Sequence, residues 1–306
     1  MPNFKEVLEE IHSVQLAQSV TVNPLDVVRR KYLDLIHQKT GRNVIAYYSG
    51  WLQKPGVADV TINDKDKQAF MVTMHRMVRS KGLDLLLHTP GGDLAATESI
   101  IDYLNSMFQG DIRTIIPQIS MSGGTMLAMC GKEIIMGKQS NLGPIDPQMG
   151  GVACQAVLDE FEEAKEDIKK NPHSAILWQP IIGKYNPTFL TACKQAIEWS
   201  KLIAGKTLSF NMCKGDPNRV AEVLRTFSDH STQKSHARHI SAQECKDAGL
   251  SVIDMEADNE LQDLILTTHH AFMHTLNHSA AVKIVENHCG VAYFENVNID
   301  QATKRA

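Results

Sequence analysis

Residues 118–126 read QISMSGGTM, and residues 88–93 read HTPGGD. Each stretch follows a short apolar run and precedes a helix-like pattern. Residues 83–87 read as a buried parallel strand, residues 94–108 as a crossover helix and residues 112–119 as the next strand. In such a unit the loops after the two strands lie side by side, so both glycine pairs are expected at one edge of a sheet.

These two turns bring a serine hydroxyl close to glycine-lined backbone amides. Ser122 stands at the start of a helix-forming segment, where unpaired amides can stabilise a developing oxyanion. Gly123 and Gly124 lack the Cβ atoms that would keep a substrate carbonyl from the backbone. A second donor is expected from Gly91 or Gly92. The pattern favours acyl-transfer chemistry; the alternative is that Ser122 only caps the helix and the glycines serve tight turns.

Four motifs in order carry a resemblance to a known family. They are HTPGGD at 88–93, MSGGTM at 121–126, SNLGPIDP at 140–147 and HISAQECKDAGL at 239–250. With them, the chain resembles the soluble serine dehydrogenase proteinase family of the Clp protease and crotonase superfamily, which includes signal peptide peptidase A. The resemblance runs from about residue 43 to residue 255. It implies an α/β fold of repeated ββα units with flanking N- and C-terminal helices.

The resemblance implies a serine peptidase that forms an acyl-enzyme. Ser122 is then the nucleophile, and the oxyanion hole comes from Gly123 and the Gly91–Gly92 turn, with Gly92 as the matching donor. Clp proteases take their base from a histidine in the loop where this chain has Asp146. A carboxylate is a weak base toward a hydroxyl, so Asp146 leaves the identity of the base open.

Several basic side chains are candidates for that role. Signal peptide peptidases use a lysine from a later segment just ahead of a helix, and Lys184 is the best positional match, with Lys201 and Lys206 as weaker substitutes. A lysine acts as a base only where burial or a neighbouring cation lowers its pKa. Two histidines are also expected to line the cleft: His88, at the end of a strand, and His236, just ahead of the motif at 239–250.

Composition and patterning limit the classes of protein. The chain has 306 residues, 43% of them hydrophobic, and a net charge of −4 without the basic patches of nucleic-acid-binding proteins. Six cysteines show no metal-ligand spacing and read as reduced thiols. No apolar stretch is long enough to span a bilayer, and the N-terminus has no signal-peptide pattern. We expect a cytoplasmic enzyme that needs no cofactor or metal.

The chain divides into a helical arm at 1–40, a catalytic domain at 41–256 and a C-terminal helix and tail at 257–306. Within these parts the patterns predict strands at 43–51, 133–136 and 174–178. They predict helices at 64–80, 152–170, 187–208, 218–228, 242–248 and 258–286.

The last of these helices carries His270, His274 and His278 on one side, with His269 beside them. Stacked histidines can bind a transition metal. A stripe that faces solvent or another subunit is the favoured interpretation, since no acidic or cysteine partner accompanies it.

The resemblance further implies a homo-oligomer that cleaves proteins or peptides, with any unfolding energy supplied by a separate ATPase. The amphipathic N-terminal arm and the histidine-bearing helix are the expected interface elements. Two alternatives stay open: a crotonase-type acyl-CoA enzyme, for which Asp146 is the favourable feature, and a non-catalytic oligomeric scaffold.

Overall fold

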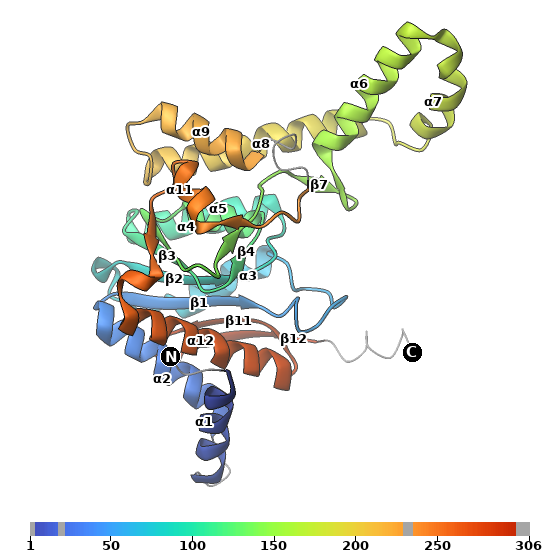
Figure 1. Cartoon of the computed structure of the whole chain (residues 1–306). Coiled ribbons are helices and arrows are strands. Elements are labelled where there is room, and N and C mark those ends of the chain that lie inside the picture. The colour runs from blue at the N-terminus through green and yellow to red at the C-terminus, as the bar shows by residue number, and fades with distance from the viewer. Residues whose placement is uncertain (1–3, 18–21, 229–234, 298–306) are drawn as a thin grey trace, which may run out of the picture.

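A twisted, mostly parallel sheet forms the centre of the protein (Figure 1). The computed structural model describes residues 4–17, 22–228 and 235–297. Within these ranges seven strands hydrogen-bond in the order β10-β5-β3-β2-β1-β11-β12. Their bounds are β1 Asn43–Ser49, β2 Leu83–His88, β3 Ile112–Ile116, β5 Glu133–Met136, β10 Val252–Asp254, β11 Ala281–Asn287 and β12 Ala292–Asn296. The strands from β10 to β1 are parallel, while β11 and β12 are antiparallel to their neighbours.

Helices cover both faces of this sheet, so the predicted α/β class is confirmed. Side chains alternate along β1, with Ile45 and Tyr47 on one face and Val44, Ala46 and Tyr48 on the other. The first face packs against α3 Asp64–Thr73, α4 Leu94–Phe108 and α5 Gly123–Met129. Helices α8 Phe189–Phe210 and α9 Pro217–Ser228 continue this core as an outer layer, with α8 on α4 and α5 and α9 on α8 (Figure 1). The second face packs against α2 Pro24–Thr40 and α12 Asn259–His278.

Short strands and helices complete the fold around the carboxyl ends of the parallel strands. A small sheet joins β4 Ile119–Ser120, β6 Asn141–Leu142 and β9 Ile240–Ser241, and β9 leads into α11 Ala242–Asp247. A hairpin of β7 Gln148–Met149 and β8 Val152–Ala153 precedes α6 Cys154–Lys170. Single-turn 3₁₀ helices occupy Arg79–Lys81, Pro172–Ser174 and Met255–Ala257.

Local signals explain where the helices begin and end. Asn23 caps α2, Pro24 occupies its first turn, and Gly41 ends it in the left-handed conformation. A capping box between Asn63 and Asp66 starts α3. These signals were readable in the sequence, and the starts of the corresponding helices agree with it.

Several predicted elements differ from the structure. The strand expected at 112–119 is divided into β3 in the central sheet and β4 in the small sheet. Residues 174–178 were expected to form a strand, but they lie in a 3₁₀ turn and in helix α7 Ala175–Ile182. The expected helix at 258–286 ends at His278, because residues 281–287 form β11 in the central sheet. The helix expected at 64–80 ends as α3 at Thr73. Parts of the predicted arm and tail, residues 1–3, 18–21 and 298–306, lie outside the described residues.

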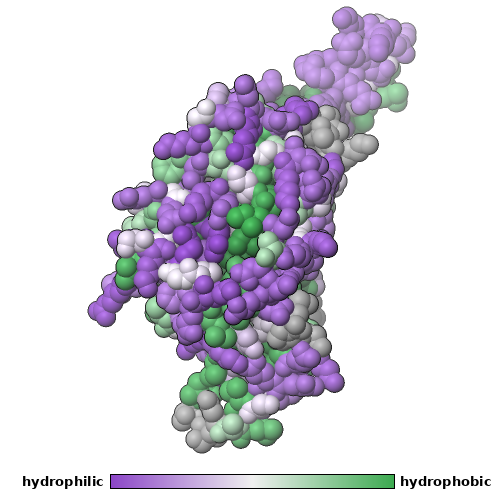
Figure 2. All heavy atoms as spheres, turned by 60° about the vertical axis from the view of Figure 1, so that its left-hand side comes forward, coloured by the Kyte–Doolittle hydropathy of each residue, from purple (hydrophilic) through white to green (hydrophobic). Residues whose placement is uncertain are grey.

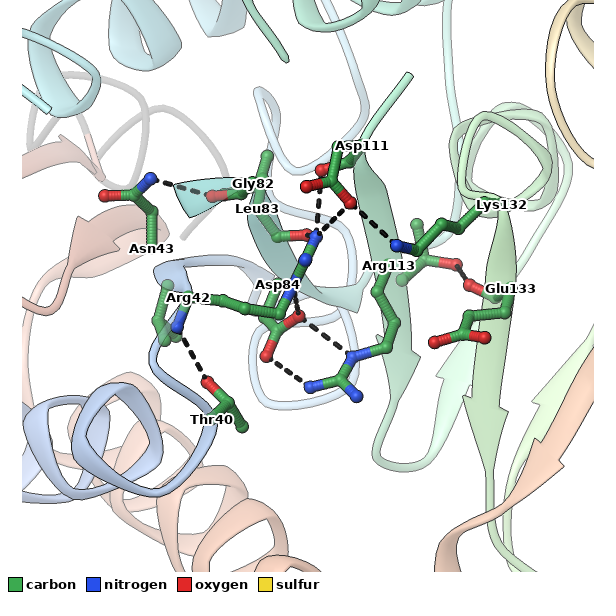
Figure 3. A network of polar contacts seen from close by, with 12 residues as sticks. Thr40, Arg42, Asn43, Gly82, Leu83, Asp84, Asp111, Arg113, Lys132 and Glu133 are labelled. Atoms are coloured by element: carbon green, nitrogen blue, oxygen red, sulfur yellow. Dashed lines mark hydrogen bonds and ion pairs between the residues drawn. The ribbon is translucent and has the colours of Figure 1, made fainter. Parts of the chain in front are cut away.

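A polar network ties together the amino ends of the parallel strands (Figure 3). The fully buried carboxylate of Asp84 on β2 accepts hydrogen bonds from Arg42 Nε at 2.8 Å and from Arg113 Nη2 on β3 at 2.6 Å. Breaking a buried ion pair on one side costs about 3–5 kcal/mol, so this network anchors the strand order. It lies at the opposite end of the strands from the two glycine turns.

Two helical segments stand out from the body. Helices α6 and α7 form a projecting arm (Figure 1), and α7 buries none of its side chains. Helix α1 Phe4–Ala17 packs Val7 and Ile11 against Val28 of α2 and Ala271 of α12. Figure 2 shows a largely hydrophilic surface with hydrophobic residues gathered at its lower end, where α1 lies and exposes Phe4 and Leu16.

None of the helices in the described ranges combines the length and apolar character that a bilayer crossing requires.

Candidate functional site

The two glycine turns meet, as the sequence predicted. Thr89 pairs with Ser120 in a parallel β-bridge. The Thr89 amide donates to the Ile119 carbonyl at 3.3 Å, and the Met121 amide donates to the Thr89 carbonyl at 2.9 Å. An ideal Cβ on Gly91 would lie 2.8 Å from both the Gly123 nitrogen and the Ser122 Cβ. The residues after β2 and the residues after β4 therefore form one site.

Ser122 occupies a strained turn between β4 and α5. Its φ of 52° and ψ of −117° lie in a region that residues with a Cβ rarely adopt. The side chain makes no capping hydrogen bond to α5, which removes the alternative that Ser122 serves only as a helix cap. A serine on a sharp strand-to-helix turn presents its hydroxyl to the space beside the sheet, as in nucleophile elbows.

Two backbone amides lie beside this hydroxyl. Gly123 is the first residue of α5, where a helix offers its amide no internal acceptor. Ile62 and Gly92 form a parallel β-bridge. The Ile62 amide donates to the Gly91 carbonyl at 2.8 Å, and the Asp93 amide donates to the Ile62 carbonyl at 2.9 Å. In this pattern the amide of Gly92 itself points away from Ile62. The Gly92 nitrogen lies 3.4 Å from an ideal Cβ on Gly123. The Gly91 amide, in contrast, donates to the Thr89 hydroxyl at 3.2 Å.

Only glycine fits at positions 91 and 92. Gly91 has a φ of 87°, and an added Cβ would lie 2.5 Å from the Met121 carbonyl oxygen. At Gly92 the Cβ would lie 2.3 Å from the Ile62 nitrogen, which is backbone and cannot move aside cheaply. The close approach of three backbone segments thus depends on the HTPGGD sequence.

A histidine and a carboxylate pair on the other side of the site. The Nδ1 atom of His236 lies 2.8 Å from Oδ1 of Asp146. Since a carboxylate only accepts hydrogen bonds, Nδ1 donates to Asp146, and Nε2 is the ring nitrogen on the side away from this carboxylate. Asp146 is buried, and its neighbour Ile145 is fixed through its carbonyl, which accepts from the Ser200 hydroxyl at 2.7 Å.

These groups border one cavity of about 790 Å³. Ser122, Gly92, Gly123 and His236 all line it. The remaining wall is mostly apolar and comes from α5, α8 and the β7 hairpin, with Met126, Ile145, Met149, Ala192, Ala196 and Trp199. The Asp93 carboxylate also borders the cavity, but it caps α4 by accepting from the Ala96 amide at 2.8 Å.

The structure places the other proposed bases elsewhere. Lys184 lies exposed between α7 and α8, on the projecting arm, and does not line the cavity. Lys206 forms a surface ion pair with Asp102 at 3.0 Å, and Lys201 is exposed on α8. Within the described ranges the cavity wall holds no lysine.

His88 also lies outside the cavity, on the opposite face of the sheet. Its ring packs between Trp51 and His269, with ring centroids 4.5 and 5.2 Å away. Burial, and then the nearby His269, hold the pKa of His88 well below its ordinary value. The expectation that His88 borders the cleft therefore gives way to a buried, neutral imidazole in the core.

Helix α1 covers His274 of α12 and contacts His270 through the Phe4 ring, while His278 is exposed. His274 is buried; its Nε2 donates to the Phe4 carbonyl at 2.8 Å, and its ring stacks on Phe4 at 3.8 Å. The expected solvent- or subunit-facing stripe is thus an intramolecular contact at this residue. Among the described residues, no cluster of histidine, cysteine and carboxylate side chains has the geometry of a metal site.

Two buried thiols lie near the site. Burial, with the neighbouring Cys193 and Asp146, raises the pKa of Cys154 to about 12. Cys154 is therefore protonated, and it packs in the small hydrophobic cluster between α6 and α8. Because the thiolate is the reactive form, thiol nucleophilic chemistry is not favoured here.

The sequence pointed to Asp146 and His236 separately but missed their pairing. Ninety positions separate them, and no local motif links the two. The contribution of α8 to the cavity wall was also missed, because the residues involved look like ordinary positions of an amphipathic helix.

Comparison with known proteins identifies the family of the chain. A family model described as ClpP-like SDH-type serine proteinase matches residues 11–180. Two uncharacterized proteins of Methanocaldococcus jannaschii are also similar. One is 29% identical over 157 residues, 50% of this chain and 54% of the relative. The other is 34% identical over 111 residues, 36% of each. The chain thus spans about half and about a third of the lengths of these relatives.

Proposed function

Because the chain belongs to the ClpP-like SDH-type serine proteinase family, we propose that it is a serine endopeptidase whose nucleophile is Ser122. The proposal is carried by the convergence of a strained serine, two glycine amides and a paired histidine on one cavity. The family consists of serine proteinases, and the residue roles below are our proposal.

We infer the following reaction from these positions. His236 Nε2 takes the proton of Ser122 Oγ while that oxygen bonds to the peptide carbonyl carbon. The amides of Gly92 and Gly123 donate to the resulting oxyanion. The carbon–nitrogen bond then breaks, and His236 returns its proton to the leaving amine. Water attacks the acyl-enzyme by the same route, giving a carboxylate product and free Ser122.

Asp146 supports this role of His236. Its carboxylate accepts from Nδ1, which holds the ring in one tautomer and stabilises the imidazolium that forms. Asp146 is then the orienting residue and not the base. In this arrangement Lys184 has no part in the chemistry.

The cavity wall indicates the kind of substrate. Apart from His236 and the capping carboxylate of Asp93, its side chains are uncharged, and most are apolar. We expect cleavage of peptides or proteins next to an apolar residue of medium size. As in related assemblies, we expect the enzyme to work as a homo-oligomer.

A substitution of the serine tests the proposal. Wild type should hydrolyse a fluorogenic peptide with an apolar residue before the scissile bond, and a fluorophosphonate should modify the Ser122 peptide. Ser122→Ala should lose both signals. Ser106→Ala, an exposed serine on α4, should keep them. Hydrolysis that survives in Ser122→Ala would sink the assignment.

The acyl-CoA alternative loses the observation that favoured it. Asp146 pairs with His236 and has no need of a role as a catalytic acid. The scaffold alternative rested on the missing histidine base, since this chain has Asp146 where Clp proteases have that histidine. His236, which pairs with Asp146, is a histidine that can act as the base.

A further inference from the structure

We propose that Lys283 and Asp66, which do not line the cavity, are positioning residues that set the direction of the Gly92 amide. The proposal rests on the proposed peptidase function and deepens it. It concerns a buried polar cluster, Lys283, Asp66, Tyr47 and Thr89, called here the buried lysine cluster.

The first step is the contact between Ile62 and Gly92. Residue 62 runs beside the glycine turn like a short strand and makes two backbone hydrogen bonds to it. An ideal Cβ on Gly92 would overlap the Ile62 backbone, so the two main chains touch directly. The position of Ile62 therefore decides the orientation of the peptide that carries the Gly92 amide.

The second step is the pair that holds both neighbours of Ile62. Lys283 Nζ donates to the Thr61 carbonyl at 3.0 Å and to the two Asp66 carboxylate oxygens at 2.7 and 2.9 Å. Asp66 Oδ2 in turn accepts from the Asn63 amide at 2.9 Å. One ion pair thus fixes the chain immediately before and immediately after Ile62.

The third step reaches the glycine turn from its other side. Tyr47 on β1 donates to Asp66 Oδ2 at 3.0 Å, and the side chain of Thr89 lies beside the Tyr47 hydroxyl. The Thr89 hydroxyl accepts from the Gly91 amide. The buried lysine cluster therefore holds Gly91 directly and Gly92 through Ile62.

Burial makes this arrangement rigid. Lys283 and Asp66 are each 2% exposed, and their opposite charges are in direct contact at 2.7 Å. A hydrogen-bonded ion pair at this depth keeps a single geometry, because any other arrangement leaves a buried charge without its partner. Placement of an oxyanion donor needs that precision, since a misplacement of about 1 Å can cost about 10²-fold in rate.

The same strand offers a matched control. Glu286 on β11 accepts from Arg29 Nε at 2.7 Å, and both side chains are fully buried. This pair lies on the opposite face of the sheet, against α2. Loss of either ion pair removes a buried charge contact from β11, but only the Lys283 pair touches the chain beside Gly92.

The test compares Lys283→Met with Glu286→Gln in the full chain. Steady-state hydrolysis of the fluorogenic peptide and affinity for a peptide boronate, which places an oxygen in the oxyanion hole, are measured beside the unfolding temperature. Lys283→Met should lower kcat about 10²-fold, with KM changed less than about 2-fold, and should weaken boronate binding in parallel. Glu286→Gln should lower the unfolding temperature but keep kcat.

A second variant covers the case in which Lys283→Met does not fold. Tyr47→Phe removes one hydroxyl from the buried lysine cluster and should lower kcat several-fold with KM unchanged. Unchanged kcat in a folded Lys283→Met or in Tyr47→Phe would overturn the inference, as would an equal loss of kcat in Glu286→Gln. Absence of Ser122-dependent hydrolysis in wild type would instead overturn the proposed function.

Discussion

At the scale of single residues, the site depends on backbone positions that side chains cannot share. Ser122 accepts a strained φ, and Gly91 and Gly92 allow three main-chain segments to touch. These residues could be identified from the sequence, because a glycine pair after a buried strand and a serine before two glycines have few structural explanations. The base could not be identified from the sequence, because its identity depends on which side chain, distant in sequence, the fold places next to Asp146.

Gly92→Ala should remove the oxyanion geometry without touching the nucleophile. The added Cβ would overlap the Ile62 backbone, so the Gly92 peptide must turn. Loss of one donor lowers kcat about 10²- to 10³-fold, and we expect that loss with the peptide substrate.

Gly205→Ala serves as the control for this substitution. Residue 205 lies within α8, and its Cβ would be 3.4 Å from a Leu224 methyl group, an ordinary contact. This variant should keep full activity. Equal activity of the two variants would contradict the assigned role of the Gly92 amide.

At the scale of elements, two of the errors come from apolar runs whose pattern does not separate a strand from a helix. Residues 175–182 form an apolar run too short for its period to separate a buried strand from a helix. Residues 281–287 follow α12 after a short break, and their apolar positions extend the helical pattern although they form a strand. Which element covers a face, as α1 covers His274, depends on tertiary packing.

Helix α12 and strand β2 should make stability depend on pH. Burial lowers the pKa of His269 to about 3 and holds the pKa of His88 well below its ordinary value. In the unfolded chain the pKa of a histidine is about 6.5. Below that pH the unfolded state binds more protons, so the free energy of unfolding falls as the pH decreases from about 6.5 toward the folded-state values.

Urea unfolding at pH 7.5 and pH 5.0 measures this effect. Below about pH 6.5, each buried histidine contributes about 1.4 kcal/mol per pH unit, so the effect comes from the lower part of this pH range. His269→Leu should therefore reduce the loss between the two conditions by about 2 kcal/mol. His173→Leu, at an exposed position in the arm, should follow wild type. The same pH dependence in His269→Leu and wild type would contradict the assignment.

At the scale of the whole molecule, the two ends of the parallel strands have different tasks. The Asp84 network fixes the amino ends, while the cavity and Ser122 lie where the strands end. The sequence predicted the meeting of the two glycine turns, because loop adjacency follows from the topology of β-α-β units. It also predicted the family. The Asp84 network was not predicted.

The expected homo-oligomer stays a prediction. Helix α1, one of the two expected interface elements, packs on α12 of its own chain. Apolar side chains of α7, on the projecting arm, are exposed: Ile176 is 74% exposed and Leu177 is 72% exposed. The sequence did not reveal this exposed helix surface, because the pattern predicted a strand at 174–178.

The central claim is that His236, held by Asp146, activates Ser122. The rate of covalent labelling by a fluorophosphonate, with the modified residue located by mass spectrometry, measures that activation directly in wild type, His236→Gln and Lys184→Ala. The account predicts labelling of Ser122 at equal rates in wild type and Lys184→Ala, and a loss of about 10²-fold or more in His236→Gln. Undiminished labelling of His236→Gln, or its loss in Lys184→Ala, would contradict it.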